Sequence, residues 1–414
     1  MQRALAELFP SLLAATPQPD NTDDMLAVMV RAVRTHLGMD VGFVSQFNGD
    51  VRSFRVVDAK ATSPIPQGSS MPMEEGYCAK VVLGHLPQLI PNTAAVPAAM
   101  AIPDTRALPI GAHLSVPIRL KSGQVYGTFC CLSHKAEPSL NERDLATMRA
   151  FADVMAFHID AEHAANARDN QRRDRVQRAI HVGDPAMVFQ PIVRLADRAV
   201  IGHEALARFA SLPLQTPDLW FEDAIHAGLA PELEFAAMRS ALCSYRGMLA
   251  DSGYFLHLNC SPRTLVQSDL GAELAGFPLD RLVIELTEHH AVTDYAELRH
   301  VLAPLRARGL RVAVDDAGAG YASMRHVLLL QPDIIKLDIS LVRDIDRDPI
   351  KHALGSAVCV FAQQTGCTVI AEGVETAAEA QALKALGAAQ AQGYYFGRPA
   401  ALQPSSDSPL RQAI

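Results

Sequence analysis

The second half of the chain alternates apolar, strand-like runs with helix-like stretches after Gly183. The eight runs are MVFQPIV, AVIGHEALAR, YFLHLNCS, RLVIELTE, RVAVDDAG, DIIKLD, TVIAEGV and GYYFGRP. Eight strands with interleaved helices over about 220 residues are what a closed (β/α)8 barrel requires, and near-continuous Val, Ile and Leu is typical of parallel strands buried on both faces. An open doubly wound sheet is the alternative, but no glycine-rich dinucleotide or phosphate loop follows any run. The sequence therefore predicts an α/β fold with a TIM-like barrel over residues 184–414.

Residues 1–160 show a different pattern. A helical run, MLAVMVRAVRTHLG, ends on Gly38, and two β-hairpins follow, one turning at Asn48-Gly49 and one at residues 121–123. A short helix (YCAKVVLGH) and an extended piece (PQLIPN) lie between the hairpins. Ser139 and Glu142 match a capping box that opens a long amphipathic helix. We expect an α+β domain in which helices flank an antiparallel sheet.

Residues 161–183 are predicted to link the two domains. The segment AEHAANARDNQRRDRVQRA is charged, nearly lacks large apolar residues and contains no Pro or Gly. It can therefore continue the preceding helix as a solvated rod, and a flexible tether is the alternative. Gly183-Asp184-Pro185 ends this segment.

Composition excludes some classes of function. With 37 Lys and Arg against 45 Asp and Glu, the net charge of −8 argues against a protein that coats nucleic acid. The sequence contains no run of about 18 apolar residues that would span a membrane. Its N-terminus resembles a signal peptide, but Glu7 interrupts the short apolar core. The seven cysteines show no CxxC spacing, which favours reduced thiols and a cytoplasmic location.

Polar side chains stand at the C-terminal ends of the barrel strands. They are Glu204, Asn259, Glu285, Asp315 and Asp316, Lys336 with Asp338, and Glu372. These strand ends converge on one mouth of an α/β barrel. So many acids in one cavity require compensation, and oxygen ligands without His or Cys suit Mg²⁺ or Mn²⁺. The pattern predicts two-metal attack of water on a phosphodiester.

Each of these residues also has an ordinary structural interpretation. A single Asp or Glu at a strand end is typically the N-cap of the next helix, and a single Lys typically forms a surface ion pair. Capping does not explain why consecutive strands all end in polar groups of one chemical kind. We therefore favour a shared site.

The segment Glu204-Ala205-Leu206, within GHEALAR, resembles the signature of the EAL family of cyclic di-GMP phosphodiesterases. The resemblance covers about residues 175–402 and includes FQPIV, LNCSP, IELTE, VDDAGAGY, DIIKLD, IAEGVET and QGYYFGRP. It implies a barrel of the type predicted above. It also implies hydrolysis of cyclic di-GMP to linear pGpG with two Mg²⁺ or Mn²⁺ ions.

The resemblance also implies roles for individual residues. The ligands of one metal are matched by Glu204, Asn259, Glu285 and Asp315, and Glu204 is also expected to be catalytic. The acids around the second metal are matched by Asp315 and Asp316, and Glu372 there binds the ion or orients its water. Lys336 matches the lysine that positions or activates water, and Asp338 matches its acidic neighbour.

The other matches concern the substrate and the surrounding loops. The substrate-binding groups are matched by Gln190, Arg208 and Gln392. Glu288 matches the glutamate that tethers the loop after Asp316, and Glu375 matches a supporting residue.

The loop after the paired aspartates departs from the family pattern. Ala317 and Ala322 stand where Phe and Ser are usual. Neither position supplies a metal ligand, so we expect the chemistry to survive, while the packing and signalling of the loop are in doubt. No GGDEF-like cyclase motif is present in the sequence.

The N-terminal domain resembles a GAF domain over about residues 20–160. Such domains bind small molecules, chromophores or haem, or serve only in dimerisation, and the sequence does not name a ligand. Cys78 invites a bilin-attachment interpretation, with a buried core cysteine as the alternative. His85 and His113 are candidate haem ligands, with ordinary satisfied or exposed histidines as the alternative.

Together these features favour a cytoplasmic phosphodiesterase regulated by a GAF-like sensor. The alternative is a catalytically weak EAL-type receptor that binds cyclic di-GMP and passes the signal to a partner. The uninterrupted charged helix after Ile159 further predicts a homodimer formed through the helices that flank the GAF-like domain, with the barrel as an additional candidate contact. Neither DNA nor a membrane is expected as a partner.

Overall fold

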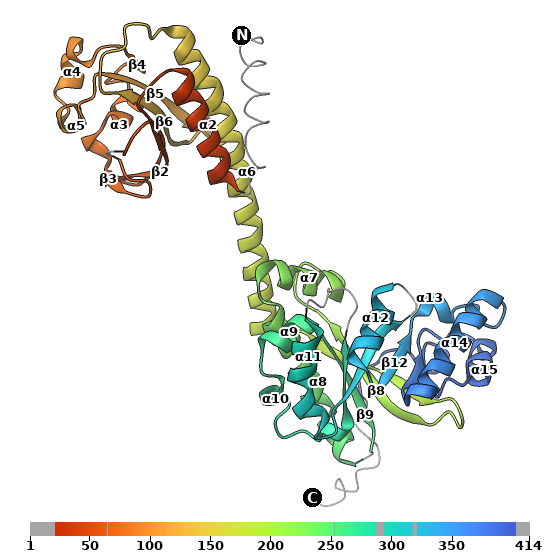
Figure 1. The fold of residues 1–414 in the computed structure, drawn as a ribbon. Helices are drawn as coiled ribbons and strands as arrows, with labels where there is room; N and C mark the ends of the chain where they lie inside the picture. Colours follow the sequence, from red (N-terminus) through yellow and green to blue (C-terminus); the bar gives the residue numbers. More distant parts are fainter. Residues whose placement is uncertain (1–20, 64, 252, 287–293, 318–320, 403–414) are drawn as a thin grey trace, which may run out of the picture. The chain divides into compact units, whose positions relative to one another are not determined.

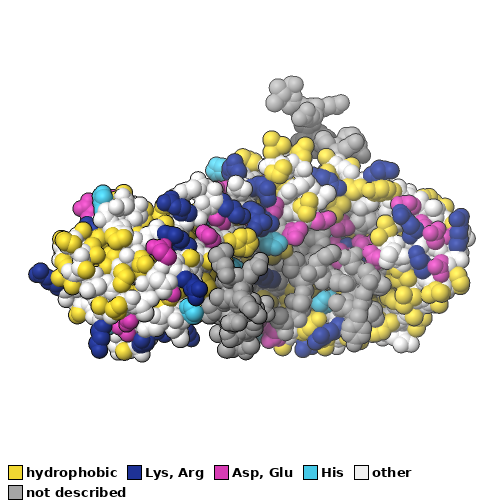
Figure 2. Space-filling model, turned by 90° about the horizontal axis from the view of Figure 1, so that it is seen from above, with side chains coloured by type: hydrophobic (Ala, Val, Ile, Leu, Met, Phe, Trp, Pro, Cys, Tyr) yellow, Lys and Arg dark blue, Asp and Glu magenta, His cyan; other side chains and the backbone are white. Residues whose placement is uncertain are grey.

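A computed structural model describes residues 21–63, 65–251, 253–286, 294–317 and 321–402 of the 414-residue chain. The chain divides into two compact units, Met1–Arg168 and Asp169–Ile414 (Figure 1). Among the described helices, none has both the length and the apolarity needed to cross a membrane. On the face shown in Figure 2, acidic and basic side chains are interspersed.

The described part of the N-terminal unit contains a six-stranded antiparallel sheet in the order β3-β2-β1-β6-β5-β4. The strands are β1 Val41–Asn48, β2 Val51–Ala59, β3 Ser70–Pro72, β4 Leu89–Ile90, β5 Ala112–Arg119 and β6 Val125–Ser133. Both predicted hairpins are confirmed, because β1 pairs with β2 around Gly49 and β5 pairs with β6 around Gly123, each glycine having a positive φ.

Helices cover both faces of this sheet. They are α2 Thr22–His36, η1 Met73–Glu75, α3 Tyr77–Val82, η2 Thr93–Ala95, α4 Pro97–Met100, α5 Pro103–Ala107 and α6 Glu142–His181. Leu26 and Val30 of α2 pack with Met148 of α6 over one face, where Figure 1 shows the two helices side by side. Tyr77 and Cys78 of α3 belong to the core on the other face. The predicted α+β architecture is confirmed.

The long helix α6 begins at a different cap from the one predicted, but it continues as predicted. Asn141, not Ser139, accepts the Arg143 N–H through Oδ1 (2.9 Å), and Asp144 Oδ2 accepts the Asn141 N–H in return (3.0 Å). The box therefore lies two residues later than predicted, because Asn is an equally good cap. As the lack of Pro and Gly predicts, α6 continues through the charged segment to His181. The domain limits drawn from the sequence stay predictions.

The described strands of the C-terminal unit close into an eight-stranded barrel in the order β10-β11-β12-β13-β14-β7-β8-β9, which confirms the predicted fold class. They are β7 Ala186–Arg194, β8 Val200–Arg208, β9 Phe255–Cys260, β10 Leu282–Leu286, β11 Arg311–Ala317, β12 Ile334–Leu337, β13 Thr368–Ala371 and β14 Gln390–Gln392. Helices α7 Pro217–Ala227, α8 Ala230–Asp251, α9 Pro262–Gln267, α10 Leu270–Glu273, η3 Leu279–Arg281, α11 Tyr295–Arg306, α12 Tyr321–Leu330, α13 Ile339–Val342, α14 Pro349–Thr365 and α15 Ala377–Leu386 connect them.

Two strand predictions need correction. β7 runs antiparallel to both β8 and β14, because a short turn, in which Arg194 N bonds Ala199 O, leaves no room for a crossover helix. The last strand is Gln390–Gln392, not GYYFGRP. After Gln392 the chain turns, and Phe396 and Gly397 donate backbone hydrogen bonds to Gly393 O.

Candidate active site

The interior of the barrel is built in layers two residues apart. Ile192, Val283, Ala313, Ile334 and Ile370 form an apolar cluster inside it. Alternate residues of a strand share one face. The next inward positions are therefore polar, and they are Gln190, Glu285, Asp315, Lys336 and Glu372. The apolar layer thus forms the floor on which the polar side chains stand.

Lys336 lies at the centre of the polar layer, with only 1% of its side chain exposed. Its Nζ lies 2.6 Å from Glu372 Oε1, 2.7 Å from Glu285 Oε2, 3.1 Å from Asp315 Oδ1 and 3.6 Å from Glu204 Oε2. Carboxylates from four strands, β8, β10, β11 and the end of β13, therefore converge on one ammonium group.

Amide side chains hold Glu204 in place. Asn259 Nδ2 donates to Glu204 Oε1 (3.1 Å), and Gln392 Nε2 donates to Glu204 Oε2 (2.7 Å). The same Gln392 nitrogen lies 2.9 Å from Gln190 Oε1, and Gln190 Nε2 donates to Gly397 O (3.1 Å). Gln392 Oε1 is buried without a hydrogen-bond partner among the described residues.

The cluster contains more negative than positive charge. Burial, with the charges of Asp315 and Glu204, raises the pKa of Glu372 to about 8 despite the nearby Lys336. Burial and the neighbouring carboxylates also raise the pKa of Glu285 well above its ordinary value. Burial opposes ionisation of Glu204, but Lys336 and the two amides outweigh it and lower the pKa of Glu204. Burial likewise disfavours the charged form of Lys336, but the four carboxylates raise its pKa well above the ordinary value.

This donor set fits a hard divalent cation. Its oxygen atoms come from carboxylates and one amide, which suit Mg²⁺ or Mn²⁺, and added positive charge would relieve the excess that raises the pKa of Glu285 and Glu372. As the described side chains stand, the acids face Lys336, and no group of three or more His, Cys, Asp or Glu among them is arranged to hold a metal ion.

Comparison with known families agrees with this architecture. Residues 173–399, more than half of the chain, match the EAL domain. The chain belongs to the EAL domain family. Residues 20–160 match the GAF domain, so both resemblances seen in the sequence are confirmed.

Relatives of the EAL domain include named enzymes. The probable cyclic di-GMP phosphodiesterase PdeI of Escherichia coli is 30% identical over 239 residues, which cover 54% of this chain and 30% of PdeI. The cyclic di-GMP phosphodiesterase PdeF of the same organism is 27% identical over 254 residues, which cover 58% of this chain and 33% of PdeF. The chain therefore spans about a third of either relative. The PaMucR phosphodiesterase, solved in a cyclic di-GMP complex, matches 56% of this chain and 97% of its own at 25% identity, with a TM-score of 0.51.

His257 is a member of the EAL site that the sequence analysis missed. It stands two residues before Asn259 on β9, and its Nδ1 lies 2.7 Å from Glu285 Oε1. Burial, with the charges of Lys336 and Arg311, lowers the pKa of His257 well below its ordinary value. His257 is therefore a neutral imidazole that shares a hydrogen bond with the Glu285 carboxyl group. The sequence contained one sign of this role, because His257 lies two residues before Asn259 and therefore on the same face of a mostly apolar strand.

The remaining predicted residues of the EAL domain do not join these contacts. Arg208 is exposed and bonds the Ala207 carbonyl. Asp338 caps α13 by accepting the Ser340 N–H (2.8 Å). Glu375 pairs with Arg343. Glu288 lies outside the described residues, as do the side chains of Asp316, Ala317 and Ala322.

The three candidate ligand-binding residues of the GAF domain differ in how deeply they are buried. Cys78 is completely buried in a core cluster, and His113 is 1% exposed. Both line a cavity of the N-terminal unit, whereas His85 is exposed and does not line it. Burial and the charge of Arg52 lower the pKa of His113 to about 3.

Proposed function

We propose that the EAL domain hydrolyses one phosphodiester bond of cyclic di-GMP and releases linear pGpG. The observation that carries the proposal is the convergence of four strand-end carboxylates on Lys336 above an apolar floor. The names of its relatives PdeI, PdeF and PaMucR support the choice of cyclic di-GMP as the substrate.

We propose that two divalent cations, Mg²⁺ or Mn²⁺, complete the site. Glu204, Asn259, Glu285, Asp315 and Asp316 would hold them. When bound, the ions would activate water and stabilise charge on the phosphodiester oxygens. The excess negative charge of the cluster supports this assignment.

The protein's own groups position the reactants. Lys336 Nζ, already a donor to Glu285 Oε2 and in contact with Glu372 Oε1, orients the attacking water together with Glu372. The amides of Asn259 and Gln392 fix the direction of Glu204. In this proposal Gln190 and Arg208 contact the substrate, and Asp338 and Glu375 support the loops around it.

The test is incubation of the purified chain with cyclic di-GMP and Mn²⁺ or Mg²⁺, with the products separated by chromatography. Glu204→Gln should lower turnover by at least about a hundredfold, because it removes a charged metal ligand. The control is Glu273→Gln, which breaks only the Arg239–Glu273 pair on the surface of the same unit. Absence of pGpG from the unmodified chain would refute the proposal.

One observation favours a second function, that of a cyclic di-GMP receptor. Lys336 already supplies a buried counter-charge to the four described acids, so part of their negative charge is balanced without an added ion. Tight binding of cyclic di-GMP in Ca²⁺, without hydrolysis in Mg²⁺ or Mn²⁺, would identify a receptor. Hydrolysis in either of the latter ions would identify the enzyme.

We further propose that the GAF domain regulates the EAL domain and that the chain forms a homodimer in the cytoplasm. The helical continuation of α6 through the charged segment supports this assembly. Sedimentation at micromolar concentration should show a dimer, and a monomer at all concentrations would contradict it.

A further inference from the structure

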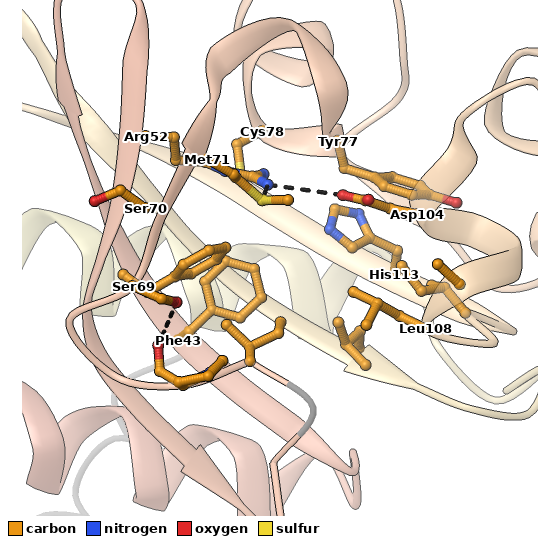
Figure 3. A pocket seen from close by; sticks show the side chains of 16 residues that line it. Phe43, Arg52, Ser69, Ser70, Met71, Tyr77, Cys78, Asp104, Leu108 and His113 are labelled. Carbon is orange, nitrogen blue, oxygen red and sulfur yellow. Dashed lines mark hydrogen bonds and ion pairs between the residues drawn. The ribbon is translucent and has the colours of Figure 1, made fainter.

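The GAF domain contains a cavity of about 160 Å³ beside the sheet. Its wall combines apolar and aromatic side chains with Arg52, Cys78 and His113, and Figure 3 shows Arg52 and Cys78 next to each other. Arg52 comes from β2, where it is in phase with the buried Phe54, and only 3% of the residue is exposed. A guanidinium group is therefore buried in this wall.

Arg52 has few anionic neighbours. Its Nη2 lies 3.7 Å from Asp104 Oδ2, while its Nη1 lies 3.0 Å from Cys78 Sγ. Its Nε is buried without a partner among the described residues. The Cys78 sulfur therefore lies closer to the guanidinium than the Asp104 carboxylate does, and the buried positive charge favours the thiolate form of Cys78.

Cys130 places a second cysteine sulfur next to Cys78. Cys130 Sγ on β6 is 3.6 Å from Cys78 Sγ, and it also contacts Ser115 Oγ (3.1 Å) and Thr128 Oγ1 (3.2 Å). Burial alone would raise the pKa of Cys78, but the Cys130 thiol and the Arg52 charge outweigh it and lower that pKa. Burial and the neighbouring Cys78 thiolate raise the pKa of Cys130. Of the two cysteines, Cys78 is therefore the one that ionises more readily.

We propose that Cys78 is a peroxide-reactive cysteine and that Cys130 is its resolving partner. The Cys78 thiolate attacks one oxygen of hydrogen peroxide, the O–O bond breaks, and the leaving hydroxide takes up the equivalent of the proton that Cys78 released on ionising and forms water. The sulfenic acid at Cys78 is then attacked by Cys130 sulfur; the Cys130 proton and the sulfenic hydroxyl leave as a second water, and a Cys78–Cys130 disulfide remains. Peroxide is reduced and the two thiols are oxidised, so the balance needs no other reactant.

Burial restricts which oxidant can take part. The Cys78 side chain is completely buried although it forms part of the cavity wall. The reaction therefore requires a local opening of that wall and favours an oxidant as small as hydrogen peroxide. The six-residue helix α3, which begins at Tyr77, carries the reactive sulfur.

Cys131 provides a matched internal control. It follows Cys130 on β6 and is equally buried, but it belongs to the core on the opposite face of the sheet. Burial raises the pKa of Cys131 to about 12. The two neighbouring cysteines thus differ in their partner and not in their exposure.

The experiment treats the reduced full-length chain with hydrogen peroxide, blocks the remaining thiols, and analyses tryptic peptides by mass spectrometry without reduction. We expect a linked peptide between Cys78 and the segment that contains Cys130 and Cys131. Trypsin does not separate these two residues, so variants assign the bond. Cys131→Ser should retain the link, whereas Cys130→Ser should abolish it and leave Cys78 as sulfenic or sulfinic acid.

Arg52 variants test the electrostatic part of the proposal. Arg52→Met should slow oxidation of Cys78 by at least about tenfold, because the thiolate population falls, and Arg52→Lys should restore much of the rate. If Arg52→Met does not fold, the cysteine variants still decide the question. Persistence of the link in Cys130→Ser, or oxidation of Cys78 no faster than that of Cys131, would overturn the proposal.

Discussion

Each of the two domains contains a buried cation next to a functional candidate, Lys336 in the EAL domain and Arg52 in the GAF domain, but the acids around them differ in number. In the EAL domain, Lys336 faces four carboxylates within 3.6 Å. In the GAF domain, Arg52 has one carboxylate at 3.7 Å and one thiol at 3.0 Å. The first site has an excess of negative charge, while the second has one carboxylate for one guanidinium and a thiol that lies closer to the cation than the carboxylate does.

This difference in charge indicates which ions each site favours. An excess of buried carboxylate oxygens favours the uptake of cations, and it raises the pKa of Glu372 until cations arrive. A buried guanidinium favours an anion, and at Cys78 it can create one from a thiol. Identical physical chemistry thus predicts metal chemistry in one domain and sulfur chemistry in the other.

The largest expected effect follows removal of the Lys336 charge. Lys336→Met leaves buried carboxylates without a counter-charge, so we expect hydrolysis to fall by at least about a thousandfold and the metal-free chain to lose about 3–5 kcal/mol of unfolding free energy. Product formation and urea unfolding in a chelator measure these losses. Lys384→Met, which removes only a surface contact to Ala196 O, is the control. Full stability of Lys336→Met without metal would contradict the charge balance described above.

The next effect concerns His257. His257→Leu removes the hydrogen bond to Glu285, so metal affinity should fall about 10–100-fold, while His257→Gln, which retains a donor, should lose less. Titration with Mn²⁺ measures the affinity. His203→Leu is the matched control, because that ring bonds the Tyr245 hydroxyl instead of a carboxyl group. Equal loss in both leucine variants would point to a general packing defect.

The sequence predicted the acids better than it predicted their partners. Glu285 and Asp315 follow apolar strand residues at a spacing of two, so their convergence could be inferred from strand periodicity. The direction of β7 was also accessible, because the turn before Ala199 is too short for a helix. The end of β14 could not be predicted, because it depends on the close packing of the Gly393 backbone against the Val374 backbone. A Cβ atom on Gly393 would lie 2.2 Å from the Val374 backbone. The Arg52–Cys78 contact joins β2 to α3 and required coordinates.

A smaller effect is a pH dependence confined to the metal-free chain. The pKa of Glu372 is about 8 in the fold and has an ordinary value of 4.5, so between these pH values the folded chain holds a proton that the unfolded chain has released. The unfolding free energy should therefore fall as pH rises toward about 8, by on the order of 1 kcal/mol per unit. Urea titrations at several pH values test this. Saturating Mg²⁺ and, separately, Glu372→Gln should each flatten the profile, and an unchanged slope in Glu372→Gln would assign it to another group.

The smallest effect tests whether Arg52 depends on its carboxylate or on its thiol. Asp104→Asn removes a partly exposed partner at 3.7 Å, so it should change the unfolding free energy by no more than about 1 kcal/mol. Cys78→Ser keeps the size of the side chain but removes the ionisable sulfur that lies 3.0 Å from Arg52, so on the proposal above it should cost more than Asp104→Asn. Urea unfolding of both variants under reducing conditions gives the comparison. A larger loss in Asp104→Asn would mean that the carboxylate balances Arg52, and the contrast between the two domains would then rest on the number of carboxylates alone.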